Sequence, residues 1–226
     1  MTTTLSIGLA LALGGQILLQ LSSKAFRFDS FSLPFRLSFW LLALAVLALA
    51  AYGGGPWLTR IGAEPLGWLS LIGAVVAAVA TLAIFPSLQR LQKILGGKGT
   101  EQTESFKKIA GLSAAHRAFL VVTAAVVEEI LYRGYGIGIG RHLFGNVSVA
   151  VGISLLLFVG SHFRWGISHL ISVFWCGLVL SLLFVATNNL FACILAHFVI
   201  DAFGVLLLPW AMARKRAREA PLAHEH

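Results

Sequence analysis

Long apolar runs, repeated along almost the whole chain, constrain the fold of this sequence more than any other feature. A helix needs about 20 mostly apolar residues to cross a bilayer. Stretches of this kind lie at about 4–22, 37–54, 66–86, 114–139, 146–163, 167–187 and 190–210. Hydrophobic residues make up 58% of the chain and charged residues 12%, about half the charged share of a soluble domain. We therefore predict an all-α fold, a polytopic transmembrane helical bundle with about seven spanning helices.

Breakers and polar residues mark the ends of these helices. The second stretch ends at Gly53-Gly54-Gly55-Pro56, and the third is expected to end near Pro86. The first stretch has no basic residues before it and no convincing cleavage site after it, so we interpret it as a retained span rather than a signal peptide. The polar stretch 89–115 reads equally well as an interfacial amphipathic turn or as a solvated linker.

The basic residues are distributed unevenly between the two sets of connections. With the C-terminus in the cytoplasm, fourteen of the 17 Lys and Arg residues lie on the cytoplasmic side. Arg60 and Arg141 lie on the outer side, and Arg133 remains inside the membrane. This bias predicts a multi-pass protein of a bacterial-type plasma membrane with a cytoplasmic C-terminus. A nucleic-acid partner is not expected, because the apolar chain leaves little room for a water-exposed basic face.

Two adjacent carboxylates occur in the middle of the fourth apolar stretch. Ionisable residues inside a membrane are costly, so each is a functional candidate. Glu129 and Arg133 are four residues apart and share a helical face, where they can neutralise each other. On an α-helix Glu128 is turned away by about 100°. Glu128 therefore needs a different partner or remains partly protonated, and a partly protonated carboxylate suits a general base or acid.

Histidines follow at helical spacing in two later stretches. His162 lies near the end of the fifth stretch, four residues after Phe158. His197 and Asp201 are four residues apart in the seventh stretch and point the same way. We expect these side chains and the two glutamates to converge on one polar cavity inside the bundle. His142 and His169 are interpreted as interfacial residues, and Cys176 and Cys193 as packing residues.

Three motifs resemble a known family of membrane proteases. The region of about 115–205 carries, in order, Glu128-Glu129-x-x-x-Arg133, Phe158-x-x-x-His162 and His197-x-x-x-Asp201. These are similar to the motifs of the CPBP (ABI) family, which comprises the type II CAAX prenyl endopeptidases and their bacterial relatives, including bacteriocin-processing and self-immunity proteins. The first three spans carry no motif that matches. The resemblance implies three segments: N-terminal helices and an amphipathic connection (1–113), a catalytic helical core (114–210) and a basic tail (211–226).

The resemblance also implies a role for each motif residue. Glu128 corresponds to the general base that activates water, and His162 to its partner. His197 and Asp201 correspond to the pair that stabilises the oxyanion. The family has Asn or Asp at the last position. With Asp201 in place of an amide, the side chain is either protonated or orients His197.

The supporting residues implied by the resemblance are Glu129, Arg133 and Phe158. The activity implied is intramembrane endopeptidase cleavage of a membrane-associated or CAAX-like peptide or protein. No cofactor is expected. Two His and one Glu are enough for an open zinc site, but the sequence lacks a His-Glu-x-x-His helix, so zinc is not favoured. Two alternatives stay open: a non-proteolytic immunity or partner-stabilising protein on the same scaffold, and a proton-coupled transporter.

Overall fold

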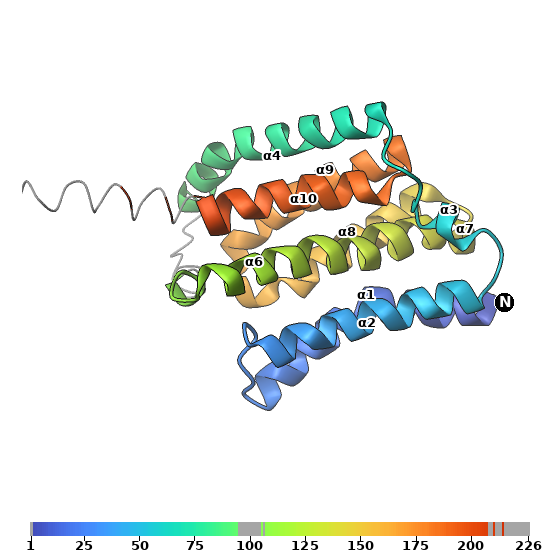
Figure 1. The fold of residues 1–226 in the computed structure, drawn as a ribbon, viewed down its shortest axis with the longest axis horizontal. Helices are drawn as coiled ribbons and strands as arrows, with labels where there is room; N and C mark the ends of the chain where they lie inside the picture. Colours follow the sequence, from blue (N-terminus) through green and yellow to red (C-terminus); the bar gives the residue numbers. More distant parts are fainter. Residues whose placement is uncertain (1, 95–104, 106, 208–209, 211–213, 215–226) are drawn as a thin grey trace, which may run out of the picture.

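The fold is an all-α helical bundle, as the apolar pattern predicts. The computed structural model describes residues 2–94, 105, 107–207, 210 and 214, and it contains no strand among them. Its elements in chain order are α1 Thr2–Ala25, α2 Leu33–Tyr52, α3 Trp57–Arg60, α4 Trp68–Ile94, α6 Ala114–Thr123, η1 Ala124–Ile139, α7 Gly140–Phe144, α8 Val147–Ser161, η2 Phe163–Trp165, α9 Ile167–Thr187, α10 Leu190–Ala202 and η3 Phe203–Leu207 (Figure 1).

The long elements run back and forth along one common direction (Figure 1). Among the described residues, 5 helices are long and apolar enough to cross a membrane: α1, α2, α4, the His169–Thr187 part of α9, and the run Leu190–Leu207. The other two predicted spans are helical as well. One is divided between α6 and η1, and the other is α8, which has only 15 residues. The chain is therefore a polytopic integral membrane protein.

Because successive long helices run in opposite directions, the connections between them lie at two opposite ends of the bundle (Figure 1). At one end, Phe31, Ile109 and Leu120 form a small apolar cluster against which Leu112 and Trp165 pack. We call this the Phe31 end. The contact of Ile109 and Leu112 agrees with the amphipathic turn, one of the two alternatives left open for 89–115, of which residues 95–104 and 106 lie outside the described part. The predicted basic tail also lies outside it, apart from residue 214.

The opposite end, which we call the Asn188 end, is fastened by polar contacts between loops. The backbone N–H of Leu190 donates to the carbonyl of Gly62 at 2.8 Å. Arg141 donates to the side-chain oxygen of Asn188 at 2.9 Å, and Asn189 donates to the carbonyl of Glu64 at 3.0 Å. These bonds fix the tight α9–α10 turn against the α3 region.

The third predicted span, α4, extends further than expected. The expected end near Pro86 is wrong, because α4 continues through Pro86 to Ile94. A proline removes one backbone N–H donor, and membrane helices tolerate that loss when neighbouring helices support them. Here the support comes from α9, since the Gln92 amide donates to the Ser172 hydroxyl at 2.7 Å.

The motif-bearing helix is a π-helix rather than the regular α-helix assumed from the sequence. From Ala124 to Ile139 its hydrogen bonds close one residue later than in an α-helix, so successive side chains are separated by less than the 100° turn used above. This helix occupies the centre of the bundle, where it packs against α1, α2, α8 and α10. Gly138 allows another backbone to approach this helix, because a Cβ there would lie 2.2 Å from the carbonyl oxygen of Arg60.

Candidate active site

The three charged residues of η1 are all buried. Glu128 is 4% exposed, and Glu129 and Arg133 are 0% exposed. A charged group at such a site needs partners with good geometry, because water cannot solvate it. The contacts of these residues fall into two groups, one around Glu128 and one around Glu129.

Glu128 contacts two other helices. Its Oε1 accepts a 2.8 Å hydrogen bond from the side-chain amide of Gln16 on α1. Its Oε2 lies 3.8 Å from Nε2 of His162, at the end of α8. The second distance is too long for a direct hydrogen bond. Glu128 therefore has one oxygen held by α1 and one oxygen facing an imidazole.

The orientation of His162 is set by its own helix. The Nδ1 atom lies 2.8 Å from the carbonyl oxygen of Phe158, one turn earlier, and the two rings are 4.9 Å apart. A carbonyl can only accept, so Nδ1 carries a proton. In the neutral ring, Nε2 then presents its lone pair towards Glu128.

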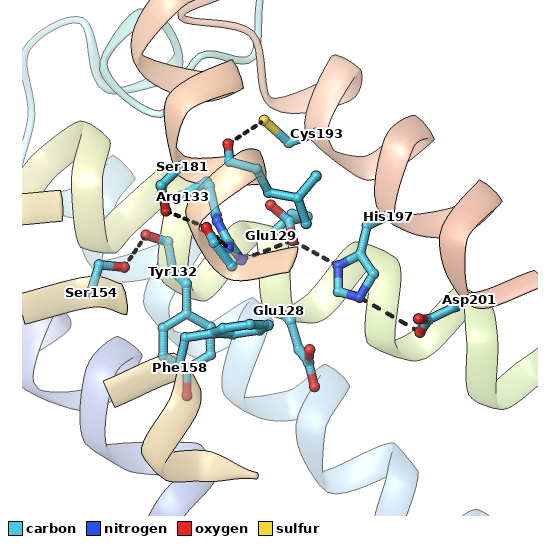
Figure 2. Close-up of polar contacts among 12 residues, drawn as sticks. Glu128, Glu129, Tyr132, Arg133, Ser154, Phe158, Ser181, Cys193, His197 and Asp201 are labelled. Atoms are coloured by element: carbon cyan, nitrogen blue, oxygen red, sulfur yellow. Dashed lines mark hydrogen bonds and ion pairs between the residues drawn. The ribbon is translucent and has the colours of Figure 1, made fainter. Parts of the chain in front are cut away.

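Glu129 lies at the centre of the second group (Figure 2). Its Oε1 accepts two hydrogen bonds, from Arg133 at 3.0 Å and from Nδ1 of His197 on α10 at 2.7 Å. The ion pair with Arg133 was predicted from the spacing. The contact with His197 was not, because 68 residues separate the two.

Arg133 is fixed on two further sides. It donates to the carbonyl of Gly177 on α9 at 2.8 Å. Its guanidinium also lies over the ring of Phe158, 4.5 Å from the ring centre, in a cation–π contact. Phe158 therefore touches both groups, since it packs against His162 and supports Arg133.

Asp201 stands one helical turn from His197. Its Oδ2 lies 3.6 Å from Nε2 of that ring, and its side chain is 33% exposed (Figure 2). With Asp201 ionised, the series Arg133, Glu129, His197 and Asp201 alternates in charge when the histidine is protonated, and the four groups then sum to zero. Asp201 is thus placed beside the free nitrogen of His197.

The structure brings the predicted residues into these two groups and adds residues that the motifs do not contain. Gln16 was missed, although an amide in the middle of an apolar first span was a visible signal. Arg36 of α2, one of the fourteen basic residues counted on the cytoplasmic side, interacts electrostatically with Glu128 and Asp201. His169 stacks on Trp165 with ring centres 5.2 Å apart, and His142 is exposed on α7.

The two groups do not make a metal-ligand cluster. Within the part of the chain that the structure describes, no three His, Cys, Asp or Glu side chains are grouped so that they could hold a metal ion. The glutamates instead use their oxygens on amide, guanidinium and imidazole partners. This donor set suits proton transfer and hydrogen bonding.

A comparison with protein families confirms the resemblance for the C-terminal half of the chain. Residues 111–203 match the family described as Rce1-like, type II CAAX prenyl endopeptidase. The matched part holds all of the elements from α6 to α10, and therefore all of the motif residues. Residues 1–110, with α1, α2 and α4, lie outside the match. No curated protein and no solved structure matches the chain.

Proposed function

We propose that this integral membrane protein is an intramembrane endopeptidase, because residues 111–203 match the Rce1-like CAAX prenyl endopeptidase family. Its substrate is a membrane-associated peptide or protein, with CAAX-like C-termini as the first class to test. The single observation that carries the proposal is the Glu128–His162 pair. In this pair the imidazole Nε2 lies 3.8 Å from a carboxylate oxygen, and its lone pair faces that oxygen.

This spacing supports water activation. Glu128 Oε2 and His162 Nε2 both accept, and they are too far apart to bond each other. A water molecule that donates one hydrogen to each satisfies both. Its oxygen then attacks the scissile carbonyl carbon while one of its protons passes to Glu128. When the tetrahedral intermediate collapses, the C–N bond breaks and Glu128 returns the proton to the leaving amine.

His197 supports the developing oxyanion in this proposal. Its Nδ1 donates to Glu129, so Nε2 donates only if the ring carries both protons. The charge balance with Arg133, Glu129 and Asp201 favours that form. Asp201 then orients the Nε2–H of His197. This N–H takes the donor role that an asparagine amide would otherwise have. A preorganised donor of this kind is worth about 10² to 10³ in kcat.

The test is cleavage of an internally quenched peptide by the purified protein in lipid nanodiscs. The peptide ends in a prenylated CAAX sequence, and the same peptide without the lipid measures whether prenylation is recognised. Glu128→Gln and His162→Ala should each lower kcat by about 10² to 10⁴. Glu64→Gln, which changes an exposed glutamate on the loop before α4, is the matched control.

If both Glu128→Gln and His162→Ala still cleave the peptide at the wild-type rate, the proposal is wrong. Stabilisation of a partner protein by the same variants would then favour a non-proteolytic role. Proton-dependent uptake into vesicles that depends on Glu128 would favour a transporter instead.

A further inference from the structure

The first helix, which lies outside the matched family region, completes the candidate active site through one side chain. Gln16 is 2% exposed and donates its amide N–H to Oε1 of Glu128 at 2.8 Å. It gives Glu128 a partner from another helix. The bond joins residues 112 positions apart, and it links α1 directly to the proposed general base.

The orientation of the Gln16 amide follows from chemistry. A carboxylate can only accept, so the NH₂ group of Gln16 must face it, and the amide oxygen faces elsewhere. That oxygen has no protein partner among the described residues. A buried amide with one unpaired atom costs free energy. An apolar side chain would pack here at lower cost, so packing alone does not account for a glutamine at this position.

The consequence concerns the direction of the Glu128 carboxylate. A glutamate side chain has several rotatable bonds and loses rotamer freedom only when something holds it. Gln16 occupies Oε1, which leaves Oε2 directed at His162. A carboxylate free to rotate would spend less time facing His162, and misplacement of a reacting group by about 1 Å costs on the order of 100-fold in rate.

We propose that Gln16 is a positioning residue that holds the Glu128 carboxylate in its reactive orientation. The role rests on the proposed function, because it acts through the base of that reaction. It also means that the Rce1-like segment alone lacks part of its site, and that α1 supplies the missing contact.

The test compares two glutamines of the same helix. Gln16→Met keeps the length of the side chain but removes the N–H donor. Gln20→Met makes the same change one turn later, at a buried residue that takes no part in the contacts of Glu128 with Gln16 and His162. Both proteins are purified in full length, checked for a single folded species, and assayed with the prenylated CAAX-type peptide.

Gln16→Met should lower kcat by about 10- to 100-fold while KM changes by less than about twofold. Gln20→Met should keep both constants near those of the wild type. If Gln16→Met does not fold, Gln16→Asn takes its place, because its shorter side chain stays polar but does not reach Glu128. Its expected result is the same fall in kcat.

Three results overturn the role. One is a kcat for the Gln16 variants close to that of the wild type. Another is an equal loss in the Gln20 variant, and the third is failure of both Gln16 variants to fold while Gln20→Met folds. Wild-type cleavage that depends on Glu128 but not on Gln16 removes only this role. Wild-type protein that cleaves nothing, or that does not need Glu128, removes the proposed function as well.

Discussion

Glu129→Gln is the substitution whose effect the structure defines most closely. The change keeps the size of the side chain and removes one negative charge. Oε1 of Glu129 accepts from both Arg133 and His197, at 3.0 and 2.7 Å. Hydrogen bonds to charged groups each contribute about 1.5–3 kcal/mol to stability. The variant weakens both bonds at once.

The larger cost falls on the partner that remains. Arg133 is fully buried and has no other carboxylate in the contacts described for it, only the Gly177 carbonyl and the Phe158 ring. Removing one member of a buried ion pair typically costs about 3–5 kcal/mol, because the other charge is left uncompensated. We therefore expect Glu129→Gln to lower the free energy of unfolding by about 3–5 kcal/mol and to lower the folded yield.

The assay is unfolding of the purified protein in mixed micelles, followed by far-UV circular dichroism. Glu129→Gln combined with Arg133→Met should regain part of the lost stability, because no unpaired charge stays behind. Activity should not return in the double variant, since His197 has still lost its carboxylate. The exposed control Glu64→Gln should stay within about 0.5 kcal/mol of the wild type. The reasoning is refuted if Glu129→Gln is as stable as the wild type. It is also refuted if the stability losses of the two single variants simply add in the double variant.

Three further predictions test the site and its packing. His197→Ala should lower kcat by about 10² to 10³, whereas Asp201→Asn should retain activity within about tenfold, because the asparagine amide can itself donate to the oxyanion; steady-state kinetics on the quenched peptide measures both. Gly138→Ala should destabilise the fold by about 1–3 kcal/mol, since its Cβ would collide with the Arg60 carbonyl, while Gly152→Ala, which meets no atom within 4 Å, should be neutral or slightly stabilising in the same unfolding assay. Peptide cleavage should be unchanged after dialysis against a strong metal chelator, and loss of turnover that zinc restores would contradict the metal-free mechanism.

Individual contacts show what could and could not be predicted from the sequence. The Glu129–Arg133 pair was predictable because the two residues lie close together on one helix, where spacing determines proximity. The partner of Glu128 was not, because Gln16 lies on another helix and nothing local specifies which buried amide meets which carboxylate. The Glu129–His197 bond was missed for the same reason. The π-helical form of Ala124–Ile139 was missed because its apolar pattern does not distinguish a π-helix from an α-helix.

The sequence by itself determined that the chain is a membrane-embedded helical bundle, because long apolar runs have only one stable way to satisfy their backbone in lipid. It also singled out a few polar residues as candidates for chemistry, since each is costly in that environment. Only the tertiary structure decided the pairing: Gln16 on Glu128, His197 on Glu129, and the length of α4 beyond its proline. Those contacts depend on how separate helices rotate and pack against one another. The distance between side chains on different helices is set by this packing and not by their spacing in the sequence.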